Sequence, residues 1–238
     1  MRILLLTTYF APDTSSNSVI VTDLAERLVD AGHAVTVVTT FPHYDINRIW
    51  DRYRGRLVQR ERNGNLDVLR TYVYLPQHKT NIVGRVWSYL SFNVLSLLVG
   101  LITRPCDAVL APSPPLTNGG VAWLLSRLKG ARFVYNVQDI YPDVAVKLGV
   151  LRSRRAIAFF SWLERFIYRK ADAITVISEG FRRNLLAKGV PEEKLWLIPN
   201  FVDTEFMVPR PRHNPFSRDH GLDNRYVALF AGNVGLSQ

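Results

Sequence analysis

Gln138 and Asp139 follow directly after Arg132–Val137, an apolar run whose length predicts a buried strand. Parallel α/β sheets bind their ligands beyond the carboxyl ends of the strands. A carboxylate at that place can orient a hydroxyl group or accept its proton, whereas a glutamine amide can hold a hydroxyl but cannot act as a base. We therefore take Asp139 as the candidate catalytic residue and Gln138 as a candidate substrate-binding residue. The alternative for Asp139 is to cap the turn that leads to Pro142.

Ser16, Asn17 and Ser18 stand where the first amphipathic helix is expected to begin. Small polar side chains of this kind cap helices by accepting hydrogen bonds from free backbone N–H groups. The same free N–H groups, together with the helix dipole, favour the binding of a phosphate group. Two interpretations remain open: helix capping alone, and capping combined with substrate contact.

His43 and Tyr44 come just before a segment that is rich in arginine and contains Trp50 and Tyr53. Its six arginines are Arg48, Arg52, Arg54, Arg56, Arg60 and Arg62. Charge runs usually form a solvated face, but a basic and aromatic surface also suits anionic lipid head groups or a pyrophosphate. His43 and Tyr44 are candidates for the lining of a substrate cleft, and a structural role in the loop is the alternative.

The segment Val86–Ile102 is strongly apolar but is interrupted by three serines and an asparagine. It falls short of the roughly 20 apolar residues that a membrane span needs. A buried helix is the first interpretation. A helix that lies at the membrane interface is the second, because aromatic residues and neighbouring arginines suit that position.

The composition narrows the classes of function. The chain of 238 residues has a formal net charge of +10, so we expect anionic partners, either phosphorylated substrates or an acidic membrane surface. No nucleic-acid-binding motif accompanies this charge, and no nucleic acid partner is expected. Cys106 is the only cysteine, so no internal disulfide can form, and the five histidines lack metal-ligand spacing. We expect a cytoplasmic protein without a bound metal.

Strand-like apolar runs alternate with helix-periodic segments along the chain. The strands are expected at Arg2–Thr8, Ala34–Thr39, Leu66–Tyr74, Ala108–Ala111, Arg132–Val137, Ala173–Ile177 and Leu195–Ile198. The helices are expected at Ser18–Ala31, Val83–Ile102, Leu116–Lys129, Arg154–Lys170 and Glu179–Lys188. This alternation is typical of a parallel sheet covered on both faces. The predicted fold class is therefore α/β, a doubly wound and mainly parallel Rossmann-like sheet.

Three segments depart from this alternation. Residues 41–65 are expected to be irregular. Residues 209–225 are rich in proline and polar residues, which predicts a linker. Residues 226–231 form a further apolar run, which the glycine turn Gly232–Gly235 follows. We expect one domain over residues 1–208, then the linker, then the first strand and glycine turn of a second, truncated domain over residues 226–238.

Several motifs resemble those of one enzyme family. The most specific is ADAITVISE at residues 171–179, followed by GVP at 189–191 and IPNFVD at 198–203. Supporting motifs are YFAPD at 9–13, FPHY at 41–44, SPPL at 113–116, QDIYP at 138–142 and FAGNVG at 230–235. Their order along the chain resembles family 4 glycosyltransferases of the GT-B fold. The resemblance is greatest to bacterial enzymes that build surface polysaccharides, such as lipopolysaccharide, on a lipid-linked carrier.

The resemblance implies the N-terminal, acceptor-side half of a two-domain transferase. Such an enzyme would transfer a sugar, with retention at the anomeric carbon, from a nucleotide-diphosphate sugar to a lipid-linked acceptor, without a cofactor or metal bound by the protein. It would work at the inner face of the plasma membrane, in contact with anionic lipids. The residues implied beside the acceptor or substrate are Asp13, Ser16, Asn17, Ser18, His43, Tyr44 and Gln138, and those beside the donor diphosphate are Gly232, Asn233 and Gly235.

The pair of glutamates, eight positions apart, that is typical of the family does not occur in this sequence. We therefore expect these residues alone to be inactive as a transferase. Two alternatives from other classes remain, a nucleotide-sugar epimerase of the same fold and a non-catalytic membrane-docking module. An epimerase would change the sugar of a donor that is incubated alone.

Overall fold

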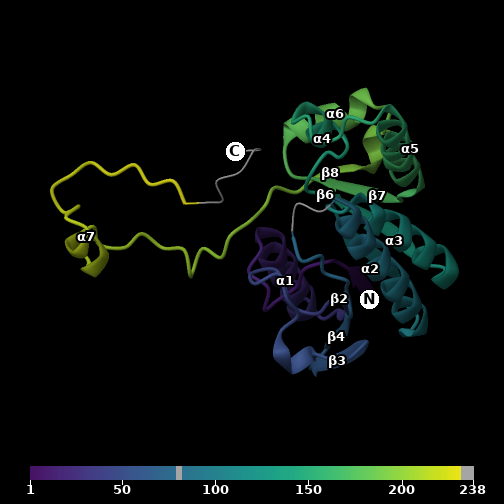
Figure 1. The fold of residues 1–238 in the computed structure, drawn as a ribbon, viewed down its shortest axis with the longest axis horizontal. Coiled ribbons are helices and arrows are strands. Elements are labelled where there is room, and N and C mark those ends of the chain that lie inside the picture. Colours follow the sequence, from purple (N-terminus) through teal and green to yellow (C-terminus); the bar gives the residue numbers. More distant parts are fainter. Residues whose placement is uncertain (79–81, 232–238) are drawn as a thin grey trace. The chain divides into compact units, whose positions relative to one another are not determined.

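The computed structural model describes residues 1–78 and 82–231 (Figure 1). The chain divides into two compact units, Met1–Asn200 and Phe201–Gln238. This division falls inside the IPNFVD motif, earlier than the boundary at residue 208 that the sequence suggested. The first unit contains the sheet, and the second contains one short helix within the described residues, α7 (Pro215–Asp219).

Within the described residues, eight strands form one sheet in the order β3-β4-β2-β1-β5-β6-β7-β8. The strands are β1 Arg2–Leu6, β2 Ala34–Thr40, β3 Val58–Asn63, β4 Leu66–Thr71, β5 Ala108–Pro112, β6 Arg132–Val137, β7 Ala173–Val176 and β8 Leu195–Leu197. All neighbouring pairs are parallel except β3 and β4. Successive strands lead away from β1 in both directions, so the order reverses between β1 and β5. The predicted doubly wound, mainly parallel sheet is confirmed.

Strand β1 shows why the sheet is covered on both faces. Leu4 and Leu6 belong to one core cluster, which includes residues of α2 (Ile82–Ile102), α3 (Leu116–Lys129) and α5 (Arg154–Lys170). Leu5 belongs to a second cluster, which includes residues of α1 (Ser16–Asp30). Successive side chains of a strand point to opposite faces, so the buried positions of β1, Ile3 to Leu6, must all be apolar, whereas Arg2 at its start is exposed. Figure 1 shows α1 on one side of the strands and α2 and α3 on the other.

The five predicted helices are all present, with ends that differ from the prediction by at most two residues. The fifth is α6 (Glu179–Ala187). The sequence did not predict the shorter elements, which are α4 (Asp143–Lys147) and the 3₁₀ turns Asp51–Tyr53 and Glu192–Lys194. A single turn has too few residues to show helical periodicity.

Residues 41–65 are not irregular throughout, which corrects the prediction. Strand β3 pairs antiparallel with β4, and Asn63 faces Leu66, so Gly64 and Asn65 form a two-residue turn. Gly64 has a φ of +54°, which glycine adopts without strain. The strand was missed because its side chains are mostly charged or polar and largely exposed, as the edge position of β3 allows.

The two edges of the sheet differ in chemistry. Strand β3 closes one edge with the sequence VQRERN. Strand β8 forms the other edge with only three residues, of which Trp196 and Leu197 are exposed. Charged residues on an edge strand oppose pairing with a further strand, so only the β8 edge is apolar.

Helix α2 has two apolar faces. Phe92 and Val99 are buried in the core cluster. The opposite side carries exposed apolar residues along its whole length, which we call the outer stripe of α2: Val83, Val86, Trp87, Leu90, Val94, Leu98, Leu101 and Ile102. From the sequence, Val86–Ile102 is too short to span a membrane, but the helix from Val83 to Ile102 is, by length and composition only, long and apolar enough to cross one, at a mean hydropathy of 1.4. The prediction of a buried helix therefore holds for the inner face of α2, which packs in the core, but not for its exposed outer face.

A buried charged group holds α4 against α5 and the end of α6. Lys188 Nζ lies 2.9 Å from Asp143 Oδ2 and 2.7 Å from Glu164 Oε1, which also accepts a hydrogen bond from the Tyr168 hydroxyl at 3.0 Å. Burial raises the pKa of Glu164, and Lys188 acts in the opposite direction. Removing one member would leave a buried charge without its partner, which is costly.

The second unit contains a short helix that the sequence did not predict and lacks an expected strand. The expected linker contains α7, where Asn214 accepts a hydrogen bond from Ser217 N at 3.0 Å and Ser217 Oγ accepts one from Asn214 N at 3.0 Å. This reciprocal cap, with Pro215 in the first turn, explains a helix in a segment rich in proline. The strand expected at Tyr226–Ala231 is not formed. A strand needs a hydrogen-bonded neighbour, and no other strand lies in the described part of this unit.

Two adjacent glycines of α3 provide a test of the packing between α3 and α5. A Cβ atom on Gly119 would lie 2.9 Å from atoms of the buried Ile167 and Tyr135, whereas one on Gly120 would meet its nearest neighbour at 3.9 Å. We expect Gly119→Ala to lower the free energy of unfolding by about 1–3 kcal/mol, because the core must shift. Gly120→Ala should be neutral or stabilise by about 0.5–1 kcal/mol through helix propensity. Urea unfolding of both variants measures this. Equal effects would contradict the packing described.

Candidate functional site

Parallel strands bring their connecting loops to one edge of the sheet, which we call the carboxyl edge. The loops concerned follow β1 (residues 7–15), β2 (41–50), β5 (113–115) and β6 (138–142). Every site residue that the sequence singled out among the described residues lies on these loops or in the first turn of α1. The carboxyl edge between β1 and β5 is the place where doubly wound sheets bind ligands.

Thr8 ties the ends of β1 and β2 together. Its carbonyl oxygen accepts hydrogen bonds from Thr40 Oγ1 at 2.6 Å, Thr39 Oγ1 at 3.1 Å and Thr40 N at 3.3 Å. Its hydroxyl oxygen accepts a further bond from Asn118 Nδ2 on α3, at 3.2 Å. All four residues are buried, so these bonds fix the two strand ends and α3 relative to one another.

Asp13 joins the loop after β1 to the loop after β2. Its Oδ1 atom accepts hydrogen bonds from the backbone N–H groups of His43 and Tyr44, both at 2.9 Å. The side chain is only 4% exposed, and burial raises its pKa even though the two N–H groups favour the charged form. The structure therefore gives Asp13 a positioning role. Contact with substrate stays a prediction.

A cavity of about 310 Å³ lies at the carboxyl edge, and we call it the tyrosine cavity. Its lining includes Tyr9, His43, Tyr44, Arg85, Ser88 and Tyr89. The Tyr9 ring centroid lies 5.4 Å from that of His43 and 5.2 Å from that of Tyr44. His43 and Tyr44 thus line a cavity together with Tyr9, and their contact with a substrate stays a prediction.

Polar groups of the tyrosine cavity have defined partners. His43 Nδ1 lies 2.8 Å from the carbonyl oxygen of Phe41, so this nitrogen carries a proton and donates it. Burial raises the pKa of Tyr9 to about 12, and Tyr89 and Asp13 add to the shift. The Tyr9 hydroxyl is therefore protonated at any physiological pH and can both donate and accept hydrogen bonds.

Arg85 supplies a positive charge to the tyrosine cavity. Its Nη2 atom donates a hydrogen bond to the Tyr89 hydroxyl at 3.1 Å. The charge of Arg85 also reaches Tyr141, on the loop after β6, where it opposes the rise in pKa that burial causes. The charge of Arg85 therefore acts on the loop that carries the predicted catalytic residue.

The start of α1 differs from the prediction in one respect. Ser15, not Ser16, Asn17 or Ser18, is the N-cap, and its Oγ accepts a hydrogen bond from Ser18 N at 3.1 Å. Ser16 is exposed, and the amide atoms of Asn17 are buried without a hydrogen-bond partner among the described residues. The capping role of these three residues is wrong because the helix begins two residues earlier than predicted. Their contact with substrate stays a prediction.

Ser113 fixes the loop that follows β6. Its Oγ accepts hydrogen bonds from Gln138 N at 3.0 Å and Asp139 N at 3.2 Å, and it donates to the carbonyl oxygen of Asp139 at 3.3 Å. Gln138 Nε2 donates to Asn136 Oδ1 at 2.8 Å, and Asn136 Nδ2 in turn donates to Thr175 Oγ1 on β7 at 2.7 Å. The position of the loop is therefore set by its backbone.

The carboxylate of Asp139 makes no hydrogen bond to a described residue. It is exposed, although partial loss of hydration raises its pKa. Helix α4 begins at Asp143 without a side-chain cap, so the alternative of a capping Asp139 finds no support in the structure. The carboxylate is available to a ligand at the carboxyl edge.

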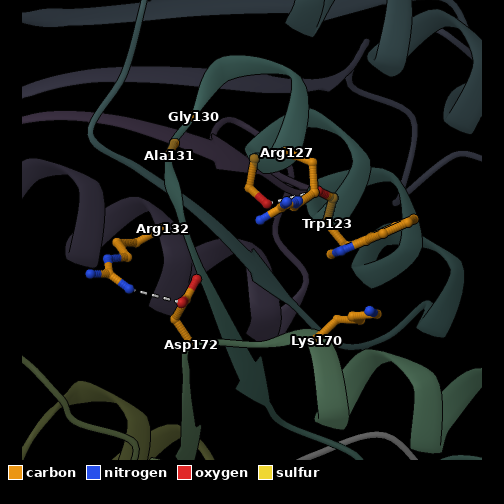
Figure 2. Close-up of a pocket in the computed structure, with 8 residues that line it drawn as sticks. Trp123, Arg127, Gly130, Ala131, Arg132, Lys170 and Asp172 are labelled. Carbon is orange, nitrogen blue, oxygen red and sulfur yellow. Dashed lines mark hydrogen bonds and ion pairs between the residues drawn. The ribbon is translucent and has the colours of Figure 1, made fainter.

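A larger cavity, of about 640 Å³, lies elsewhere on the molecule (Figure 2). Its lining includes Arg132, the first residue of β6, and Asp172, just before β7, whose side chains are 3.1 Å apart. These positions are at the amino ends of the strands, opposite the carboxyl edge. The basic residues of this cavity, Arg127 and Lys170, lie near helix C-termini, where a positive charge interacts favourably with the helix dipole.

The residues predicted beside the donor diphosphate have no described counterpart. Gly232, Asn233 and Gly235 lie outside the described residues. No group of three or more His, Cys, Asp or Glu side chains in the described residues is arranged to hold a metal ion.

Sequence reasoning missed Arg85, Tyr89 and Tyr141. Arg85 and Tyr89 stand in the first turns of a helix that is otherwise apolar, so the hydrophobic pattern hid them. The available signal was their spacing of four, which places both on one helix face. Tyr141 lay inside the QDIYP motif, but only the three-dimensional structure brings it near α2.

Replacing Asp13 tests its positioning role. Asp13→Ala removes the acceptor of two buried N–H groups, so we expect the free energy of unfolding to fall by about 1–3 kcal/mol. Asp45→Ala is the matched control, because Asp45 is exposed and, among the described residues, accepts a side-chain hydrogen bond only from the Thr14 hydroxyl. It should change stability by less than about 0.5 kcal/mol. Denaturant unfolding measures both, and an Asp13→Ala variant as stable as Asp45→Ala would show that the two loops do not depend on this carboxylate.

Comparisons with known proteins agree with this geometry. Residues 18–200 match the sequence model of the glycosyl transferase 4-like domain. The chain is 25% identical over 250 residues to the "Putative colanic acid biosynthesis glycosyl transferase WcaI" of Escherichia coli (strain K12), covering 100% of this chain and 60% of that protein. It is 36% identical over 70 residues to the alpha-galactosylglucosyldiacylglycerol synthase of Streptococcus pneumoniae (strain ATCC BAA-255 / R6), covering 28% of this chain and 19% of that protein.

A solved structure shows the same fold. HepE of Anabaena, in complex with UDP and glucose, superposes with a TM-score of 0.57 at 15% identity, covering 94% of this chain and 51% of HepE. The chain thus spans less than two thirds of the length of these proteins. Because the family model matches most of its residues, the chain belongs to the family of glycosyl transferase 4-like domains.

Proposed function

We propose that this chain is the acceptor-side half of a retaining glycosyltransferase, which moves a sugar from a nucleotide-diphosphate sugar to a lipid-linked polysaccharide acceptor. The observation that carries the proposal is the tyrosine cavity at the carboxyl edge of a glycosyl transferase 4-like domain. A cavity with aromatic walls and a few fixed polar groups suits the apolar faces and the hydroxyl groups of a sugar.

Two of the similar proteins support the choice of substrates. HepE was solved with UDP and glucose, which favours a nucleotide sugar as the donor. The pneumococcal synthase is named for a product that contains diacylglycerol, and WcaI for colanic acid biosynthesis, which favours a lipid-linked acceptor and a surface polysaccharide. The first amides of α1 and the predicted turn Gly232–Gly235 are the candidate contacts for the donor diphosphate.

The chemistry would rest on stabilising the charge that grows on the departing diphosphate, for which backbone N–H groups at helix starts are suited. Asp139 would orient the acceptor hydroxyl and assist the removal of its proton. Its carboxylate has no competing partner among the described residues, and its raised pKa makes it a better base than an ordinary aspartate. Gln138 would hold a second hydroxyl through its carbonyl oxygen or its remaining amide N–H, since one N–H already donates to Asn136.

The intact enzyme tests this function. We expect it to transfer sugar from a nucleotide sugar, and Asp139→Asn to lower kcat by roughly 10²-fold, the scale of a positioned acid–base group. The matched control is Asp30→Asn, because Asp30 is exposed at the far end of α1. Unchanged kcat in Asp139→Asn together with a lower melting temperature would make Asp139 a structural residue. Epimerisation of the donor in the absence of acceptor would replace the proposed function by that of an epimerase.

We also propose that the protein works in the cytoplasm, peripherally bound to the inner face of the plasma membrane. The arginines between Arg48 and Arg62 contribute less to this than their number suggests. Arg48 and Arg54 lie 3.7 and 3.0 Å from Asp51, and Arg60 lies 2.5 Å from Asp67. The outer stripe of α2 is the stronger support, because an exposed apolar helix face suits the membrane interface.

Binding to anionic vesicles tests the membrane contact. Val94 on the outer stripe is 56% exposed, and Val19 on α1, on the other side of the sheet, is 61% exposed. If the stripe enters the interface, Val94→Ser should weaken vesicle binding severalfold, since burying a valine side chain is worth about 1.5 kcal/mol. Val19→Ser should bind as the wild type does. About 1 M salt should weaken only the electrostatic part of the binding, because the Debye length falls to about 3 Å. Equal effects of the two substitutions would exclude α2 as the contact.

A further inference from the structure

Arg85, Ser88 and Tyr89 lie on one face of α2, because residues three and four apart are neighbours on a helix. All three line the tyrosine cavity. The outer stripe begins in the same turns with Val83, Val86 and Trp87, and the helical repeat of 3.6 residues puts it on the opposite face. One stretch of helix therefore presents a polar cavity on its inner side and an apolar surface on its outer side.

Arg85 is the permanently charged residue of the cavity lining. No carboxylate lines the cavity, and no described acidic residue lies within ion-pair distance of Arg85. The neighbouring Tyr89 raises the pKa of Arg85, which keeps its guanidinium fully charged. A cation with five donors and no acidic partner, in a cavity of neutral groups, is suited to a phosphate group.

The walls of the cavity are held in place by hydrogen bonds between its elements. Asn47 Nδ2 donates to the carbonyl oxygen of Pro76 at 3.0 Å, which joins the loop after β2 to the loop after β4. Ser91 Oγ, on α2, accepts from Tyr74 N at 2.9 Å. The cavity is thus a built feature of the fold.

We propose that Arg85 binds the phosphate that joins the acceptor sugar to its carrier lipid. The sugar would lie against Tyr9 and Tyr44, and the lipid chain would remain in the membrane below the outer stripe. The inner and outer faces of α2 are separated by one helix diameter, about 10 Å. The sugar and phosphate of the acceptor would thus lie on the inner side of α2 and its lipid on the outer side. This inference rests on the proposed function, because it gives the proposed acceptor its binding site.

Binding of defined probes to the 238-residue chain tests the inference. The probe is farnesyl-pyrophosphoryl-glucose in neutral detergent micelles. We expect Arg85→Gln to weaken its binding roughly tenfold or more, the scale of a lost charge-assisted hydrogen bond, and Arg85→Lys to weaken it less. Arg104→Gln is the matched control, because Arg104 is an exposed arginine just beyond the other end of α2. It should leave the affinity within about twofold of the wild type.

Two further probes separate the possible roles of Arg85. Farnesyl glucoside, which lacks phosphate, should bind the wild type and Arg85→Gln alike. If Arg85→Gln weakens the binding of farnesyl glucoside as much as it weakens that of the pyrophosphate probe, Arg85 acts only by shaping the cavity through Tyr89, and the inference is wrong. Glucose 1-phosphate should bind the wild type much more weakly than the lipid-linked probe. Equal affinity would assign the site to soluble sugar phosphates and would overturn the link to a carrier lipid.

The failure of this inference can be told apart from the failure of the proposed function. If the intact enzyme transfers sugar and Arg85→Gln leaves its KM for a lipid-linked acceptor unchanged, only the inference fails. If Arg85 binds the pyrophosphate probe as described but the intact enzyme transfers no sugar, the proposed function fails and the binding site remains. Melting temperatures of the variants confirm that each one is folded.

Discussion

A single buried carbonyl oxygen, that of Thr8, accepts three hydrogen bonds from Thr39 and Thr40, and the geometry of the carboxyl edge depends on it. A buried carbonyl without donors would cost free energy, so the ends of β1 and β2 cannot separate without a penalty. Asn118 extends the same constraint to α3. Asp13 then fixes the next loop to this frame through two backbone N–H groups. Hydrogen bonds therefore fix the loops of the site relative to the strand ends, which apolar packing alone would not do.

This frame explains how a cavity can be assembled from distant segments. Tyr9 comes from the loop after β1, Tyr44 from the loop after β2, and Arg85 from α2. Hydrogen bonds join these segments to their neighbours, through Asp13 between the loops after β1 and β2 and through Ser91 between α2 and Tyr74. Helix α2 connects the two environments that the proposed acceptor needs, since its inner face belongs to the protein and its outer face is apolar and exposed.

The sequence predicted the sheet and its long helices well because their burial requires continuous or periodic apolar patterns, as in β1 and α5. The prediction from the sequence failed for elements that strand pairing or helix capping determines. Strand β3 is stabilised by pairing with β4 and carries charges that hide it. The start of α1 depends on which of several serines provides the cap. His43 and Tyr44 could be proposed as cavity residues because they follow a buried strand. Arg85 could not be proposed, since its role depends on where the helix lies in space, and a hydrophobic pattern does not contain that information.

The unlike edges of the sheet limit how copies of this protein can associate. A sheet that is open on both sides can add strands without end, which is how fibres grow. Here the charged strand β3 closes one side, and β8 exposes only three residues on the other. If two copies paired through their β8 strands, neither copy would have an unpaired apolar edge strand left. Sheet extension through β8 would therefore end at a symmetric pair, because the charged strand β3 opposes pairing at the other edge.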